Sequence, residues 1–137
     1  MSAFLDRLVV MLDDPKANSH TGQWQLVKPL RYQSDLAGDV ITVPFGFSTD
    51  FASVPRKSVI LWGLFGGRAM RPAVVHDHIT RQRLYRREKC DRIFLEAMKA
   101  DGVPMNKAMP MYLAVCAVTA SGAWKREYDQ PGYEPIA

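Results

Sequence analysis

Cysteine is scarce in this chain, which has only Cys90 and Cys116 among its 137 residues. Two cysteines in predicted helices do not make a disulfide framework, and they lack the spacing of a zinc site. Buried, reduced thiols in a cytoplasmic protein are therefore expected. The first residues, MSAFLDRLVVMLDDPK, lack the basic leader and small-residue cleavage site of a signal peptide, so we expect no secretion by that route.

Long hydrophobic runs, internal repeats and low-complexity segments are also missing. The longest uncharged stretch, residues 108–124, has 17 residues and contains Thr, Ser and Gly. This length is at the lower limit for crossing a bilayer, so a buried helix is the better interpretation and no transmembrane segment is expected. The composition, 47% hydrophobic and 23% charged, instead favours one globular domain over residues 1–137.

The net charge of +4 comes largely from one run of basic residues: Arg81, Arg83, Arg86, Arg87 and Lys89. Such a run can attract phosphate-bearing partners, but a solvated helix end and turn is the simpler interpretation. Nucleic acid is not expected as a partner, because Tyr85 is the only aromatic residue beside the run on which bases could stack.

Residues 4–47 are predicted to be rich in strands. LVVML (8–12) is a continuous apolar run, residues 13–22 have the composition of a loop, and SDLAGD (34–39) is a turn before the β-branched VITV. Pro29 and Pro44 indicate strand ends, so antiparallel hairpins are the simplest connection. The residues expected to point inward are Trp24, Leu26, Leu30 and Tyr32.

Residues 68–125 are predicted to form three helices, after a loop at 48–67 and before an irregular tail at 126–137. The first opens at Arg71–Pro72 and runs to about residue 84. The second ends at Asp101–Gly102, where glycine suits the cap. The third begins with Asn106 as its N-cap and takes Pro110 into its first turn. Its expected inward stripe is Met109, Tyr112, Leu113, Cys116 and Ala120. The fold class is therefore α+β.

His76, Asp77 and His78 follow one another on the first predicted helix. Consecutive helical residues point about 100° apart, so His76 and Asp77 face different neighbours. Asp91 is the expected partner of His76, because both lie about equally far from the turn between two antiparallel helices. The pair could be catalytic, or it could only pin the two helices together. His78 is expected on a polar face, and neither it nor His20 is given a role.

Asp50 lies in TDFASVP (49–55), within the predicted loop. A loop carboxylate, backbone carbonyls and a helical carboxylate together often bind hard cations such as calcium, with oxygen ligands at about 2.3–2.6 Å. Asp77 could supply the helical carboxylate. The alternative is that Asp50 caps a turn, a role that Ser48 and Thr49 could share.

Three stretches together, VPFGFSTDFASVPR (43–56), AVVHDHIT (73–80) and CDRIFLEAM (90–98), resemble a family of small uncharacterised proteins of tailed phages and prophages. The resemblance extends over about residues 24–124. It implies a phage or prophage origin, a location in the host cytoplasm or the virion, and other phage structural proteins as partners.

The helical half, about residues 48–124, is similar to the active-site helices of bacterial and fungal phospholipase A(2). That family has His-Asp on one helix, an Asp on the next, a Tyr-rich third helix and a preceding calcium loop. The matching stretches here are His76–Asp77, CDRIF (90–94), MYLAV (111–115) and STDFASVP (48–55). The tyrosine three residues after the Asp is replaced by Thr80, and the disulfides of the secreted members are absent.

The resemblance implies a calcium-dependent hydrolase of lipid esters, acting on phospholipid or another component of the host envelope. His76 would be the general base that activates water, and Asp91 would orient it. Tyr112 could stand in for the missing tyrosine.

The same resemblance implies that Asp77, Asp50 and a backbone carbonyl near Phe51 hold calcium, which polarises the ester carbonyl. Thr49 and Arg56, in the same stretch of loop, are further candidate site residues. The competing hypothesis is a non-enzymatic phage protein, for the virion, for assembly or for a host interaction, that retains the scaffold.

Overall fold

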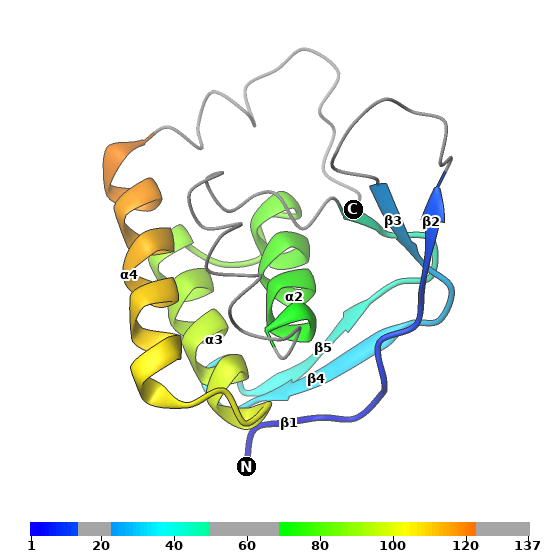
Figure 1. Cartoon of the computed structure of the whole chain (residues 1–137), viewed down its shortest axis with the longest axis horizontal. Coiled ribbons are helices and arrows are strands. Elements are labelled where there is room, and N and C mark those ends of the chain that lie inside the picture. Colours follow the sequence, from blue (N-terminus) through cyan, green and yellow to red (C-terminus); the bar gives the residue numbers. More distant parts are fainter. Residues whose placement is uncertain (14–22, 50–68, 123–137) are drawn as a thin grey trace.

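The computed structural model describes residues 1–13, 23–49 and 69–122. Figure 1 shows that strands precede helices, which confirms the predicted α+β class. The strands are β1 (Ala3–Phe4), β2 (Val10–Asp13), β3 (Gln23–Leu26), β4 (Leu30–Ser34), β5 (Asp39–Val43) and β6 (Ser48–Thr49). The helices are α2 (Met70–Arg81), α3 (Arg87–Ala100) and α4 (Met105–Ser121).

The strands form two antiparallel three-stranded sheets, with the orders β1–β4–β5 and β2–β3–β6. The predicted turn at 34–39 joins β4 to β5 in a hairpin that pairs Leu30 with Val43 and Ser34 with Asp39. Side chains of β4 alternate between buried and exposed, as expected for a strand with one face on the core. The predicted inward positions of Leu26, Leu30 and Tyr32 are confirmed, since all three are fully buried.

A tight turn over Pro44–Phe47 carries the chain from one sheet to the other. The Phe47 amide donates to the Pro44 carbonyl at 3.2 Å, and Gly46 at the third position has φ +83°. This is the position of a type II turn that requires a positive φ, which glycine adopts without strain. The turn buries Phe47 and starts β6, the strand that leads toward Asp50.

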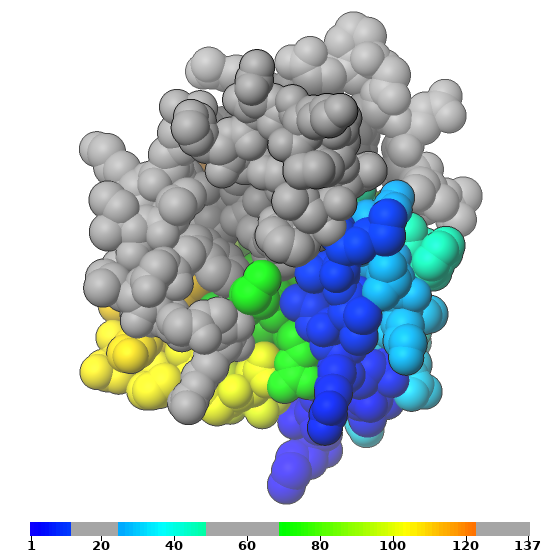
Figure 2. Space-filling model, turned by 45° about the vertical axis from the view of Figure 1, so that its right-hand side comes forward, coloured from blue at the N-terminus to red at the C-terminus, as the bar shows by residue number. Residues whose placement is uncertain are grey.

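Helices α2 and α3 pack on the β1–β4–β5 sheet, and α4 packs on α3 (Figure 1). Figure 2 shows the strand-rich N-terminal part, in blue and cyan, along one side of the molecule, with α2 in green beside it. One core cluster lies between the sheet and these two helices, and includes Leu30, Tyr32, Val75 and Ile93. A second cluster joins the three helices through Ala73, Phe94, Met98, Met111 and Val115.

Glu96 of α3 fastens the helical layer to the β4–β5 hairpin. Its Oε1 accepts hydrogen bonds from the hydroxyls of Tyr32 and Ser34, both at 2.7 Å. Its Oε2 accepts from the backbone amide of Leu36 at 2.9 Å. One carboxylate therefore fixes the hairpin turn against the helix that also carries Asp91.

Helix α2 ends at Arg81, three residues before the expected end. The chain turns at Arg83, which has φ +50°, and the Leu84 amide donates to the Ile79 carbonyl at 3.1 Å, closing the helix. Helix α3 ends where predicted, because Gly102 has φ +82° and lets the Val103 amide reach the Met98 carbonyl at 2.9 Å.

The third helix begins at Met105, close to the predicted start, but its predicted N-cap and inward stripe are wrong. Pro104, not Asn106, precedes its first turn, and its carbonyl accepts from the amides of residues 107 and 108. Because the helix starts earlier, Pro110 is an exposed residue of its second turn. The buried face consists of Ala108, Met111 and Val115, while Leu113 of the expected stripe is 57% exposed.

Candidate functional site

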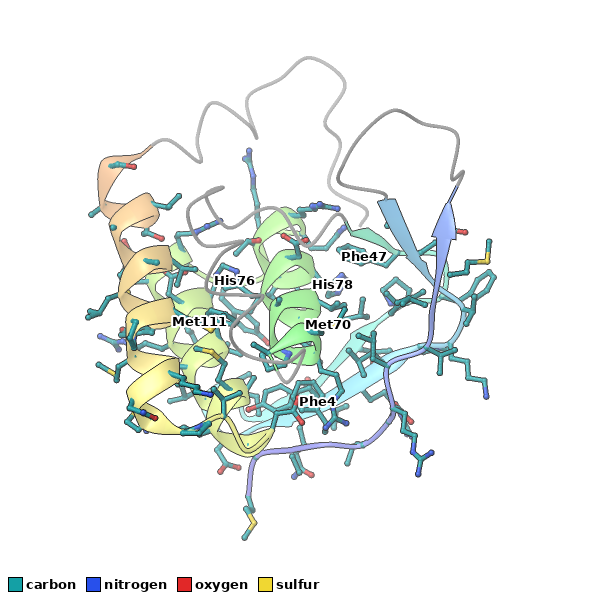
Figure 3. The ribbon with its side chains drawn as sticks, viewed as in Figure 1. Phe4, Phe47, Met70, His76, His78 and Met111 are labelled. Atoms are coloured by element: carbon teal, nitrogen blue, oxygen red, sulfur yellow. The ribbon has the colours of Figure 1, made fainter. Side chains whose placement is uncertain are left out.

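His76 of α2 and Asp91 of α3 form a buried pair between the two helices. His76 Nε2 lies 2.8 Å from Asp91 Oδ1, and the two side chains are 7% and 1% exposed. The expected contact between His76 and Asp91 is therefore confirmed. The His76 ring also packs on Phe94, with ring centroids 5.0 Å apart. Figure 3 shows His76 and His78 on different sides of α2, with His78 toward Phe47.

The hydrogen-bond roles within the pair follow from the carboxylate. An ionised carboxylate only accepts, so His76 Nε2 carries the hydrogen and donates it to Asp91. The other ring nitrogen, Nδ1, makes no hydrogen bond with the described part of the chain. This tautomer has its acceptor nitrogen on the side of the ring away from Asp91.

A third helix completes the surroundings of Asp91. Thr119 of α4 donates its hydroxyl to Asp91 Oδ2 at 2.6 Å. Arg87, one turn before Asp91 on α3, donates from Nε to the Thr119 oxygen at 3.2 Å and lies 3.8 Å from Asp91 Oδ1. Asp91 is thus held by residues from α2, α3 and α4, of which sequence reasoning found only His76.

The resemblance to phospholipase A(2) implies that Tyr112 could stand in for the missing tyrosine. It lies on α4 two turns before Thr119, half-buried against the helical core cluster. Its interaction with Cys116, followed by burial, raises the pKa of the Tyr112 phenol. Among the described residues, Thr119 and not Tyr112 is the α4 residue hydrogen-bonded to Asp91.

Asp77 lies next to the strand end that leads to Asp50. Arg81, one turn further along α2, places Nη2 at 3.5 Å from Asp77 Oδ2 and donates from Nη1 to the Ser48 carbonyl at 2.6 Å. This guanidinium links β6 to the helix that carries Asp77. The structure therefore shows Ser48 beside α2, while the predicted approach of Asp50 to Asp77 lies outside the described residues.

The remaining predicted site residues fall outside what the structure describes. Asp50, Phe51 and Arg56 are beyond the described ranges, and Thr49 is described only as a backbone position in β6, opposite Trp24. The described residues contain no cluster of three or more His, Cys, Asp or Glu side chains able to hold a metal ion. Asp77, which is 3% exposed, offers carboxylate oxygens of the kind that calcium takes, beside the positive charge of Arg81.

The prediction that His78 lies on a polar face is wrong. It is 8% exposed and meets the Phe47 ring edge-on, with centroids 5.4 Å apart. Burial lowers the pKa of His78, and its Nδ1 has no hydrogen-bond partner among the described residues. The reason for the error is that α2 is buried at every position from Pro72 to Thr80, so it has no polar face there.

The run of basic residues does not form one surface. Arg87 turns inward, with 8% of its side chain exposed, and Arg81 bonds to Ser48 and Asp77. The residues Arg86, Glu88, Lys89 and Arg92 line a shallow surface groove of about 330 Å³. None of the described helices is long and apolar enough to cross a membrane.

The fold and site together define an α+β protein in which three helices enclose a His–Asp pair behind a small antiparallel sheet. The chain belongs to the family described as protein of unknown function (DUF1353), whose model matches residues 24–115. That range includes His76, Asp77 and Asp91 and ends before Thr119.

One relative is the uncharacterized protein y4jT of Sinorhizobium fredii (strain NBRC 101917 / NGR234). It is 36% identical over 74 residues, which cover 53% of this chain and 22% of the relative. The chain therefore matches about a fifth of the length of that protein. No solved structure matches the chain.

Proposed function

We propose that this protein is a calcium-dependent hydrolase of lipid esters, with a His–Asp site similar to that of phospholipase A(2). The observation that carries the proposal is the buried contact of 2.8 Å between His76 Nε2 and Asp91 Oδ1. A base needs a neutral imidazole whose second nitrogen can accept a proton, and this hydrogen-bond pattern supports that tautomer.

In the proposed reaction, His76 Nδ1 takes a proton from a water molecule as that water attacks the ester carbonyl. Asp91 accepts the hydrogen bond from Nε2 throughout, and its negative charge stabilises the imidazolium that forms. His76 then returns the proton to the leaving alkoxide. Water is the nucleophile, so no serine or cysteine is required; the Cys90 thiol has its pKa raised to about 12 by burial and is unsuited to attack.

Asp77, Asp50 and a backbone carbonyl near Phe51 are the proposed calcium ligands. Calcium, when bound, supplies positive charge that polarises the ester carbonyl and stabilises the developing oxyanion. The oxygen donors of Asp77 and the hydrogen bond from Arg81 to Ser48, which brings β6 beside α2, support this placement. Arg81 places a positive charge beside Asp77, so in the proposed site the Asp77 carboxylate interacts with both the calcium ion and the Arg81 guanidinium.

The proposed substrate class and setting come from the resemblances in the sequence. Phospholipid or another component of the host envelope is the proposed substrate, and the protein is proposed to act in the host cytoplasm or the virion of a tailed phage. Other phage structural proteins are the proposed partners.

The experiment is a release assay with mixed phosphatidylcholine and phosphatidylglycerol vesicles. Purified protein is incubated with millimolar calcium or with a chelator, and free fatty acid is measured. The proposal predicts release with calcium and none with chelator. Absence of release at every calcium concentration up to about 10 mM, where weak extracellular-type sites are filled, contradicts it.

A second candidate function is a non-enzymatic phage component. The observation that favours it is that both oxygens of Asp91 are used in joining helices, Oδ1 to α2 and Oδ2 to α4. If the pair is purely structural, replacing His76 by Asn together with Asp91 by Leu should lower the stability of the protein but leave its function in vivo unchanged. Loss of function with full stability would exclude this candidate.

A further inference from the structure

The hydroxyl of Thr119 and the guanidinium of Arg87 lie beside the Asp91 carboxylate that His76 contacts. We infer that Thr119 and Arg87 are positioning residues, which hold the Asp91 carboxylate in the orientation that fixes the His76 ring. The inference concerns how the pair is held, and its catalytic consequence rests on the proposed function. Neither Thr119 nor Arg87 is placed against substrate.

The geometry of Asp91 supports a fixed carboxylate. Oδ1 receives His76 Nε2 at 2.8 Å from α2, and Oδ2 receives the Thr119 hydroxyl at 2.6 Å from α4. The second distance lies in the range of charge-assisted hydrogen bonds from a hydroxyl to a carboxylate, about 2.5–2.7 Å. Because donors on two different helices hold the two oxygens, the carboxylate cannot rotate without breaking one of the bonds.

Arg87 sets the direction of the Thr119 hydroxyl. A threonine hydroxyl can donate in several directions. Here its oxygen accepts from Arg87 Nε at 3.2 Å, which favours a hydroxyl hydrogen directed at Asp91 rather than at Arg87. The same guanidinium lies 3.8 Å from Asp91 Oδ1, with 8% of the Arg87 side chain exposed. Its positive charge therefore attracts the Asp91 carboxylate and helps to hold it in this orientation.

The arrangement forms a directed sequence of hydrogen bonds, Arg87 to Thr119 to Asp91, with His76 donating to Asp91 from the other side. Removing the Thr119 hydroxyl leaves Oδ2 without this donor and frees the carboxylate to rotate. The His76 ring then loses a fixed partner although no atom of the ring has been changed.

The test compares Thr119→Val, which keeps the shape and removes the hydroxyl, with Thr119→Ser, which keeps the hydroxyl. Ser121→Ala, on the exposed side of the same helix, is the matched control. Nitrogen NMR of the histidine rings reports the tautomer and the solvent exchange of the Nε2 hydrogen, and the His76 signals are assigned by their loss in His76→Gln.

We expect wild type, Thr119→Ser and Ser121→Ala to show one His76 tautomer, with hydrogen on Nε2 in slow exchange. Thr119→Val is expected to exchange this hydrogen at least about tenfold faster and to show mixed tautomers. In the vesicle assay it is expected to lower kcat about tenfold or more with little change in KM, and Thr119→Ser to restore kcat. Wild-type exchange and tautomer in Thr119→Val would overturn the inference, whatever the activity.

Arg87→Met provides a second variant if Thr119→Val does not fold. It keeps much of the aliphatic length of Arg87 and removes the donor to Thr119, so faster exchange at His76 is again expected, and an unchanged ring signal would refute the role of Arg87. Altered His76 signals in these variants, together with no fatty-acid release by wild type, would support the positioning role and reject the proposed hydrolase.

Discussion

Replacing Asp91 by Asn tests how much the carboxylate at the centre of the three helices contributes to stability. Asparagine has nearly the same shape, and its oxygen can still accept from His76 Nε2. It removes the negative charge, however, and puts an amide NH₂ where Oδ2 accepted from Thr119 at 2.6 Å. The Thr119 hydroxyl must then turn or lose its partner, and Arg87 loses the carboxylate 3.8 Å from its Nε.

The magnitude follows from these contacts. A hydrogen bond to a charged group contributes about 1.5–3 kcal/mol against about 0.5–1.5 kcal/mol for a neutral one, so the loss of charge costs about 1 kcal/mol in each of two bonds. Disruption of the Thr119 bond at a side chain that is 1% exposed costs about 1–2 kcal/mol more. The expected loss in the free energy of unfolding is therefore about 3–4 kcal/mol, within the total of about 5–15 kcal/mol typical of a domain.

The assay is urea unfolding followed by tryptophan fluorescence and circular dichroism. Asp39→Asn, at an exposed position in β5, is the control and should change stability by less than about 0.5 kcal/mol. A loss below about 1 kcal/mol in Asp91→Asn would refute the reasoning, because it would mean that the bonds to Asp91 are not made in solution.

Further predictions concern the hairpin, a buried histidine, a buried thiol and the proposed metal site. Glu96→Ala should lower stability by about 2–4 kcal/mol in urea unfolding, because three hydrogen bonds to the β4–β5 hairpin are lost, and Glu96→Gln should recover part of this. Burial lowers the pKa of His78, so the unfolded chain takes up a proton below about pH 6.5 that the folded chain resists. Stability should then fall with decreasing pH by up to about 1.4 kcal/mol per unit, and His78→Gln should reduce that slope; an equal slope in the variant would be a contradiction. In a Cys116→Ser variant, Cys90, whose pKa is raised to about 12, should resist an aromatic disulfide reagent at pH 8 until urea unfolds the protein. Calcium at millimolar concentration should raise the melting temperature, and Asp77→Asn should remove the increase, whereas a shift that persists in the variant would place the ion elsewhere.

The His76–Asp91 contact could be predicted from the sequence because it depends on local regularities. Asp91 shares a helix face with Phe94 and Met98, both buried, so its inward direction follows from helical periodicity. The short connection between α2 and α3 makes the two helices antiparallel neighbours, so residues equally far from that connection lie opposite one another. The hairpin at 34–39 was predictable for a similar reason, since its turn residues and alternating strands lie close together in the chain.

The contact with Thr119 could not be predicted in the same way. It joins residues 28 positions apart, and it depends on how α4 is rotated about its own axis. Apolar residues occur on almost every side of α4, so their spacing does not determine which face is buried. The expected stripe was accordingly rotated from the true one, and Tyr112 was chosen instead of Thr119. The available signal was that the last turn of this largely apolar helix contains two hydroxyl side chains, Thr119 and Ser121.

The burial of His78 could not be predicted from the sequence of α2 alone, because it depends on the other elements that pack around this helix. The prediction of a polar face used only the usual position of an additional, isolated histidine. The Pro44–Phe47 turn brings Phe47 over it instead, through a change of sheet that the local sequence does not specify.

The most direct test of the central claim is the rate of calcium-dependent fatty-acid release by His76→Gln relative to wild type, from the same vesicles and at the same saturating calcium. Asp39→Asn serves as the control for an unrelated polar change. The account predicts that the control matches wild type and that His76→Gln releases fatty acid at least about a hundredfold more slowly while remaining folded, as expected for loss of a general base. Equal release by His76→Gln and wild type would contradict the account.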